Sequence, residues 1–341
     1  METKIVHALR QALIDEMNRD HQVVLLGEDI AVFRGAYRVT EGLLDIFEEK
    51  RVKDTPISEA AIIGAAIGAA MTGLRPVAEM QFNDFIACGM DQLCNQAAKM
   101  RSMMGGQVAV PIVLRAPIGA TGRAAQHSQS LEGWFMHTPG LKVVMPSTPY
   151  DAKGLLKTAI RDDNPVVFLE HKMLYGGLSP GGKAKTAVDS LAEYYTATPD
   201  DDYTIPFGEA VIKKKGNDCT IVATSLTVHK ALAAGAILQD QGIDCEVIDP
   251  QTLAPLDRET ILASVQKTGR LVVASEEVLT AGFAAEICAI VAEEAVEYLL
   301  APVKRVCAFD TPIPFAPAME QNAIPQIENI VTAVLTVLEY V

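Results

Sequence analysis

The sequence predicts an α/β protein made of two doubly wound α/β domains. Short apolar runs rich in β-branched residues alternate along the chain with longer amphipathic or alanine-rich stretches. Such runs, bounded by Gly, Pro or charge, fit strands of a sheet that helices cover on both faces. The alternation stops at a stretch rich in Gly, Pro, Ser, Thr and Asp, and then restarts. With 341 residues and an apolar share of 49%, the chain can fill two cores.

The first domain is expected at residues 1–180. Its predicted buried strands are Val23–Gly27, Pro76–Met80, Val110–Arg115, Lys142–Met145 and Val166–Leu169. Helical spacing of the apolar residues predicts helices over Val6–Arg19, Glu59–Thr72, Asp91–Met103 and Asp151–Asp162.

Three glycines, Gly64, Gly68 and Gly73, lie in and just after the second of these helices. Their spacing does not match a dinucleotide-binding loop, and the sequence contains neither a Walker motif nor a Gly-x-Ser-x-Gly elbow. A Rossmann oxidoreductase and an α/β-hydrolase are therefore disfavoured. We expect the glycines to serve helix packing, because a small residue lets a neighbouring element approach closely.

A linker is expected at residues 181–205, with a short helix over Ser190–Tyr195 as an open alternative within it. The second domain is expected at residues 206–341. Its predicted strands are Cys219–Thr224, Asp244–Ile248, Leu271–Ser275 and Lys304–Ala308. Its predicted helices are Val228–Gln241, Arg258–Val265 and Gly282–Leu299.

Charge and cysteine usage narrow the class of protein. The 43 acidic and 29 basic side chains give a formal charge of −14, which disfavours binding to nucleic acid or to an anionic membrane surface. The first residues lack the order of a signal peptide, and the longest apolar run is too short to span a bilayer. The 6 cysteines form no C-x-x-C pair, which disfavours zinc and a disulfide framework. A cytoplasmic location is expected.

Two short polar segments are the candidate functional features. In Asp54–Ala60, Glu59 is expected in the first turn of a helix, where a carboxylate also interacts favourably with the helix dipole. Structural capping is therefore the alternative for Glu59. In Ala124–Ser130, a single histidine, His127, follows an apolar strand and a glycine-containing loop. Its alternative is a loop side chain held by a neighbouring polar group of Gln126 or Ser128.

These segments and several others resemble one family, the β subunits of the E1 component of thiamine-diphosphate-dependent 2-oxo acid dehydrogenases. The resemblance covers nearly the whole chain and implies a pyrimidine-binding domain followed by a transketolase C-terminal-type domain. The motifs that carry it are, in order, Gly27–Ile30, Gly35–Gly42, Asp54–Glu59, Gly73–Glu79, Gln81–Phe85, Ala125–Gln129, Pro139–Val144, Tyr150–Leu155, Asn164–His171, Ile248–Asp257 and Asp310–Phe315.

By this resemblance, the first domain binds the aminopyrimidine ring of thiamine diphosphate. The glutamate that matches Glu59 hydrogen-bonds N1′ of the ring and favours the imino tautomer, which removes the C2 proton of the thiazolium. Phe85 matches the aromatic residue that stacks on the pyrimidine, with an ordinary core aromatic as an equal alternative. Glu28, Ile57 and Gln81 match positions close to the ring.

The resemblance implies two further groups of residues. His127 matches a histidine at the mouth of the active-site channel, where an imidazole that titrates near neutrality can give a proton to the lipoyl sulfur. Some members of the family bind K⁺ through backbone carbonyls at positions that match Ile112, Ala159, Ile160, Asp162 and Asn164.

The chain departs from the family pattern at two places. Cys88 lies one helical turn from Phe85, where some relatives carry a polar side chain. The connection from Gly176 to Asp202 is longer than the family's usual linker. Neither departure changes Glu59.

The resemblance also implies partners and a reaction. Thiamine enzymes bind Mg²⁺ on the diphosphate through a Gly-Asp-Gly segment and a later Asn, and no Gly-Asp-Gly occurs in this sequence. We therefore expect an α2β2 heterotetramer in which an E1 α subunit carries the Mg²⁺ site and shares the thiamine diphosphate. The expected acceptor is the lipoyl group of an E2 core.

The substrate remains open among pyruvate, acetoin and branched-chain 2-oxo acids. Thr148–Lys153 and Glu170–Gly176 look closest to the pyruvate and acetoin members. Two other functions stay as alternatives: a self-sufficient transketolase-like enzyme, and a non-catalytic scaffold subunit with the same fold.

Overall fold

The computed structural model describes residues 2–176, 196–199 and 201–340. Its internal contacts divide the chain into two compact units. Unit 1 comprises residues 1–118 and 135–207, and unit 2 comprises residues 119–134 and 208–341. The expected division into 1–180, 181–205 and 206–341 stays a prediction, because most of that linker, including Ser190–Tyr195, lies outside the described residues.

Unit 1 contains a parallel sheet with the strand order β6-β7-β5-β4-β2-β3. The long apolar strands are central and buried, and the shorter β6 and β3 lie at the two ends of this order. A separate antiparallel pair joins β1 to β8. The strands are β1 (Glu2–Thr3), β2 (Val23–Gly27), β3 (Val52–Asp54), β4 (Arg75–Glu79), β5 (Val113–Ile118), β6 (Lys142–Val144), β7 (Val166–His171) and β8 (Thr196–Ala197).

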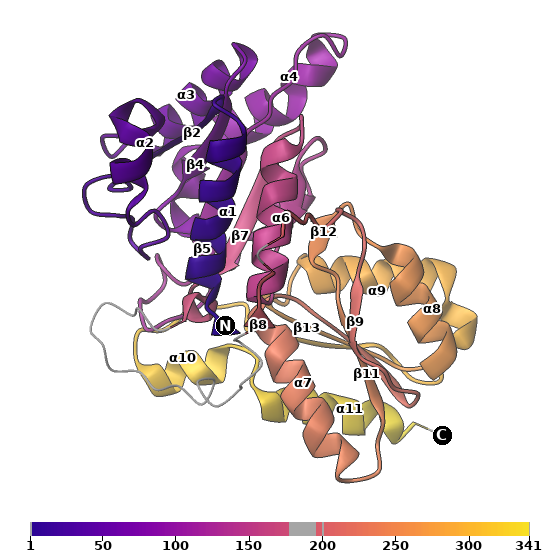
Figure 1. Cartoon of the computed structure of the whole chain (residues 1–341). Coiled ribbons are helices and arrows are strands. Elements are labelled where there is room, and N and C mark those ends of the chain that lie inside the picture. Colours follow the sequence, from indigo (N-terminus) through magenta and orange to yellow (C-terminus); the bar gives the residue numbers. More distant parts are fainter. Residues whose placement is uncertain (1, 177–195, 200, 341) are drawn as a thin grey trace. The chain divides into compact units, whose positions relative to one another are not determined.

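Helices cover this sheet. The helices α1 and α6 pack side by side in front of the strands in the view of Figure 1. The apolar helix α3 contacts β2 and β4, and it also packs against the helical turns η1 and η2. The helices of unit 1 are α1 (Ile5–Arg19), α2 (Leu43–Arg51), α3 (Glu59–Met71), η1 (Asn83–Cys88), the π-helix η2 (Gln92–Ala97), α4 (Ala98–Met103), α6 (Pro149–Arg161) and η3 (Lys172–Tyr175).

Unit 2 is built on a five-stranded sheet with the order β14-β13-β10-β11-β9. Only β9 is antiparallel to its neighbour, and the strand order reverses at β10, as in a doubly wound sheet. The strands are β9 (Val211–Lys214), β10 (Cys219–Ala223), β11 (Cys245–Asp249), β12 (Thr252–Ala254), β13 (Leu271–Val278) and β14 (Lys304–Ala308). The helices are α5 (Glu132–Met136), whose first three residues belong to unit 2, then α7 (Leu226–Gln239), α8 (Arg258–Thr268), α9 (Phe283–Glu294), η6 (Val296–Tyr298), α10 (Pro317–Ala323) and α11 (Ile327–Leu338).

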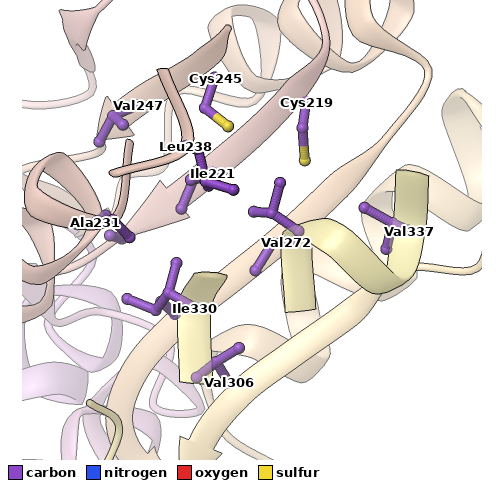
Figure 2. Close-up of a cluster of buried hydrophobic side chains, with 14 of the residues drawn as sticks. Cys219, Ile221, Ala231, Leu238, Cys245, Val247, Val272, Val306, Ile330 and Val337 are labelled. Carbon is purple, nitrogen blue, oxygen red and sulfur yellow. The ribbon is translucent and has the colours of Figure 1, made fainter. Parts of the chain in front are cut away.

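The core of unit 2 lies between its sheet and the helices α7 and α11 (Figure 2). Ile330, Val334 and Val337 form one buried stripe of α11. Cys219 and Cys245 are free thiols within the same cluster, where burial raises the pKa of both and each packs as a small apolar side chain. Both units confirm the predicted α/β class.

Several predicted elements differ from the observed ones. The strand expected from Val110 begins at Val113, because Pro111 lacks an N–H and Ile112 donates locally to the Val110 carbonyl (2.8 Å). The helix expected over residues 91–103 starts as the π-helix η2. The helix expected over residues 282–299 ends at Glu294 and is followed by the short turn η6.

The packing role expected for the three glycines was wrong for two of them. Within the described residues, no atom lies within 4 Å of the Cβ position of Gly68 or Gly73, and Gly64 has only an ordinary contact of 3.6 Å with Gln92. Gly73 instead follows α3 with a positive φ of 104°. At Gly89, by contrast, a Cβ would lie 2.5 Å from Cδ1 of Ile63 on α3, so a side chain there would require Ile63 to move.

Candidate active site

Glu59 is the first residue of α3, and its position depends on a pair of connections in unit 1. The carboxylate of Asp54 accepts hydrogen bonds from the backbone N–H groups of Ala31 (2.6 Å) and Val32 (3.2 Å). The N–H of Thr55 donates to the carbonyl of Gly27 (3.0 Å). These bonds tie the loop after β2 to the segment that leads into α3. They place Glu59 beside the carboxyl end of β2.

Glu28 and Glu59 share one neighbourhood. Burial raises the pKa of Glu28, and the charges of Asp29 and Glu59 raise it further. Because like charges oppose a second ionisation, the charge of Glu59 makes Glu28 easier to protonate than an isolated carboxyl.

Phe85 lies on η1, directly after β4, and η1 packs against α3. Its ring meets that of Phe82 edge-on, with centroids 5.6 Å apart. At the end of this turn, a Cβ on Gly89 would lie 3.3 Å from the backbone oxygen of Glu59, so the missing side chain brings the two elements together. Asn83, on the same turn, is fully buried, and neither polar atom of its side-chain amide has a hydrogen-bond partner within the described residues.

The five predicted cofactor residues therefore lie at the start of α3 and just after the ends of β2 and β4. Gln81 is half-buried between β4 and η1, and Ile57 precedes α3 with 77% of its surface exposed. A carboxyl donor, an aromatic ring and a buried amide with free hydrogen-bonding capacity fit a polar heterocycle such as an aminopyrimidine. The role of each residue stays a prediction.

His127 belongs to unit 2, in a segment that we call the His127 segment (Gly119–Trp134). The side chain is half-buried, and its backbone N–H donates to the carbonyl of Ala124 (3.3 Å), a residue with a positive φ of 61°. Within the described residues, Oγ of Ser128 forms no hydrogen bond, so Ser128 does not hold the imidazole. Gln126 is exposed.

The five carbonyls predicted for K⁺ lie at one end of unit 1, around the turn between α6 and β7. The guanidinium of Arg75 donates to the carbonyls of Ile160 (3.0 Å) and Asp162 (3.1 Å). The carbonyl of Ile112 accepts from Val166 (2.9 Å), and that of Ala159 accepts from the N–H of Asp162 (3.3 Å). The guanidinium thus occupies two of the five positions.

Two buried acidic clusters were not predicted from the sequence. In unit 1, Arg115 on β5 is fully buried and bonds Glu79 of β4 (2.5 Å) and Glu170 of β7 (2.6 and 2.7 Å). In unit 2, Glu132 of α5 and Glu277 of β13 are both buried. The sequence contains only a weak indication of these clusters, which is the presence of a charged residue inside or at the end of an apolar strand.

Comparison with known proteins identifies the family. Residues 2–177 match the family described as "Transketolase, pyrimidine binding domain", and residues 208–330 match "Transketolase, C-terminal domain". The "Pyruvate dehydrogenase E1 component subunit beta" of Rickettsia felis is 46% identical over 341 residues, covering 100% of this chain and 99% of the relative. The chain belongs to the E1 β-subunit family of pyruvate and acetoin dehydrogenases. The resemblance read from the sequence is confirmed.

Other similar proteins are named as subunits of acetoin oxidoreductases. The "Acetoin:2,6-dichlorophenolindophenol oxidoreductase subunit beta" of Bacillus subtilis is 45% identical over 344 residues, covering 97% of this chain and 96% of the relative. Among solved structures, the "Split gene transketolase, inactive beta4 tetramer" superposes with a TM-score of 0.78 at 22% identity, covering 100% of this chain and 99% of that chain. At this identity, the superposition shows the fold alone.

The described residues contain no group of three or more His, Cys, Asp or Glu side chains that could hold a metal ion. None of their helices is long and apolar enough to cross a bilayer.

Proposed function

We propose that this chain is the β subunit of an E1 component that, with a separate α subunit, decarboxylates pyruvate and transfers the acyl group to a lipoyl group of E2. The observation that carries the proposal is the full-length similarity to E1 β subunits, together with the convergence of Glu28, Glu59 and Phe85 in unit 1. A cytoplasmic location is part of this proposal.

Thiamine diphosphate, when bound, supplies a carbon nucleophile that also accepts the electrons released as carbon dioxide leaves. Glu59 would hold the N1′ atom of its pyrimidine by donating a carboxyl proton. Glu28, whose pKa is raised by burial and by the charges of Asp29 and Glu59, would lie beside it. Phe85 would offer a ring face to the pyrimidine, and Gln81 and Ile57 would border it.

The Mg²⁺ site is assigned to an α subunit. No Gly-Asp-Gly segment occurs in the sequence, and the described residues hold no carboxylate cluster for a metal. A diphosphate without Mg²⁺ ligands would bind weakly, so the purified chain alone should have no turnover. The partner would complete an α2β2 heterotetramer. K⁺ at the five carbonyls of unit 1 remains part of the proposal, with Arg75 as a competitor for two of them.

His127 would act in the second half of the reaction. An imidazole near neutrality can donate a proton to the lipoyl sulfur as the disulfide opens.

Acetoin cleavage is the second candidate, because acetoin-oxidising β subunits are as similar to the chain as pyruvate dehydrogenase β subunits are. The deciding experiment reconstitutes the chain with an α subunit, thiamine diphosphate and Mg²⁺. Pyruvate, acetoin and branched-chain 2-oxo acids are then compared by kcat/KM. Turnover by the chain without a partner would indicate a self-sufficient enzyme. Cofactor binding and assembly without turnover on any of the three substrates would indicate a scaffold subunit.

A further inference from the structure

The N-terminal part of the His127 segment is attached to unit 2 by buried carboxylates. The backbone N–H of Ala120 donates to Oε1 of Glu276 on β13 (2.6 Å). The N–H of Gly122 donates to both carboxylate oxygens of Glu320 on α10 (2.9 and 2.8 Å). Such bonds to an ionised acceptor are among the stronger hydrogen bonds in proteins. One end of the segment is therefore well fixed.

The other end of the segment meets a second carboxyl group of β13. Glu132 is fully buried, and neither of its carboxyl oxygens has a hydrogen-bond partner within the described residues. Its neighbour Gly133 brings the backbone against Glu277, since a Cβ there would lie 3.5 Å from Oε2 of Glu277. Gly282 closes the same space, because its Cβ would lie 2.2 Å from the carboxyl carbon of Glu277. The carboxyl group of Glu277 therefore lies against the backbone next to Glu132, and both acids are buried.

We propose that the buried acids Glu132 and Glu277 together hold one proton, carried by Glu132, which lets the C-terminal end of the His127 segment stay on β13, and that loss of this proton releases the segment. The part of this inference that concerns acyl transfer rests on the proposed function. The part that concerns the attachment of the segment does not.

The electrostatics of the pair agree with its geometry. Burial raises the pKa of both acids, and their proximity raises the pKa of Glu132 further, with a smaller push from Glu276. The other groups around Glu277 are the hydroxyl of Ser275 (3.3 Å) and, beyond it, the thiol of Cys307. Within the described residues, no cation pairs with either acid. A buried carboxylate without a cation favours its protonated form, so the pair keeps a proton above the ordinary range.

The helix that follows explains which acid ionises first. Glu277 accepts hydrogen bonds from Ser275 and from the backbone N–H of Ala284 (3.0 Å) in the first turn of α9. These donors stabilise its carboxylate, whereas Glu132 has none within the described residues. Glu132 is therefore the proton carrier, and Glu132→Gln would keep a neutral donor there at every pH.

The first test needs no catalytic activity. Hydrogen exchange of peptides from residues 119–134 is measured in the full chain between pH 6 and 9, corrected for the intrinsic exchange rate. Because the closed segment keeps a proton that the opened segment loses, the opening equilibrium should rise by up to about tenfold per pH unit until the pair ionises in the closed segment, and then level off. Glu132→Gln should abolish this rise, and Glu286→Gln, an exposed acid on α9, should retain it. Glu277→Gln serves as a second variant if Glu132→Gln does not fold.

The second test uses the assembled α/β enzyme. The rate with a lipoyl acceptor, divided by the rate with a small artificial acceptor, should fall more steeply as pH rises in the unaltered enzyme than in Glu132→Gln, where only the dependence on the proton donor to the lipoyl sulfur remains. Exchange that does not depend on pH in the unaltered chain, or an equal rise in Glu132→Gln, overturns the inference. If exchange behaves as expected but no substrate turns over, the proposed function fails and the proton-sharing pair stands.

Discussion

Both units bury a pair of glutamates near the carboxyl end of a strand, but the two pairs are neutralised in different ways. In unit 1, Glu79 and Glu170 are held by Arg115 through three hydrogen bonds. In unit 2, Glu132 and Glu277 have no cation within the described residues. A guanidinium keeps its charge at every accessible pH, whereas a shared proton is lost as pH rises.

The difference separates a structural cluster from a titratable one. Burial raises the pKa of Glu79, Arg115 acts in the opposite direction, and the two carboxylates raise the pKa of Arg115. The hydroxyl of Tyr175 also donates to Glu170, which satisfies a further lone pair. The unit 1 cluster should therefore contribute little pH dependence near neutrality. Of these two clusters, the Glu132–Glu277 pair of unit 2 should contribute more to the pH dependence of stability near neutrality.

The largest expected effect comes from removing the cation of unit 1. Arg115→Leu leaves Glu79 and Glu170 buried together without a partner, which should lower the free energy of unfolding by about 3–5 kcal/mol at pH 7.5. Without Arg115, burial would raise the pKa of Glu79 with no cation to oppose it. The loss should therefore shrink as pH falls toward 5, where the acids can protonate. Urea unfolding at both pH values measures this.

Arg115→Lys is the matched control, because it keeps the charge and removes the two-pronged geometry. It should lose less stability than Arg115→Leu at pH 7.5. A loss for Arg115→Leu that does not vary with pH would contradict the comparison between the two clusters.

The next effect concerns Glu59, a half-buried acid of unit 1 that is expected to act in catalysis. Glu59→Gln keeps size and hydrogen bonding but cannot deliver a carboxyl proton, so kcat of the assembled enzyme should fall roughly 10²-fold or more. Stability should change by less than about 1 kcal/mol, since a charge in the first turn of a helix is worth no more. Normal kcat in a folded and assembled variant would return Glu59 to a capping role.

The positions of buried strands could be predicted closely from the sequence. The continuous apolar run Val23–Gly27 predicted β2 without error. The bounds of β14 were also predicted correctly, although this strand begins with two basic residues. The helix α11 was missed, since its many β-branched residues resemble a strand in composition. Its buried face at Ile330, Val334 and Val337 has helical spacing, so the period carried the information that composition obscured.

The candidate site was predictable only in part. Glu28, Glu59 and Phe85 came from short motifs whose order along the chain could be compared with a family. The pairing of Glu132 with Glu277 could not be predicted, because the two acids are far apart in sequence and each looks like an ordinary charged residue. Gly89 was missed for the same reason: its requirement comes from a neighbouring helix, not from its own turn.

A smaller effect should separate the His127 segment of unit 2 from the cofactor residues of unit 1. His127→Ala should leave most of the rate with a small artificial acceptor and lower the rate with a lipoyl acceptor, by roughly 10²-fold if the imidazole donates the proton. The measurement is the ratio of the two rates in the assembled enzyme. An unchanged ratio would remove His127 from the acid-base step and leave the family assignment intact.

The smallest expected effect is the stabilisation of unit 1 by K⁺ at the five predicted carbonyls, two of which already accept hydrogen bonds from Arg75. At a concentration near its dissociation constant, K⁺ should raise the free energy of unfolding by less than about 1 kcal/mol. The thermal unfolding temperature should therefore rise only slightly. The reason is that Arg75 already donates to the carbonyls of Ile160 and Asp162 and repels a second positive charge.

Arg75→Met should strengthen the K⁺ effect relative to Na⁺. Arg101→Met is the matched control, because Arg101 donates to the side chain of Asn164 (2.8 Å) and to none of the five carbonyls within the described residues. An equal gain in both variants would show that K⁺ responds to the general loss of positive charge and not to the freed carbonyls.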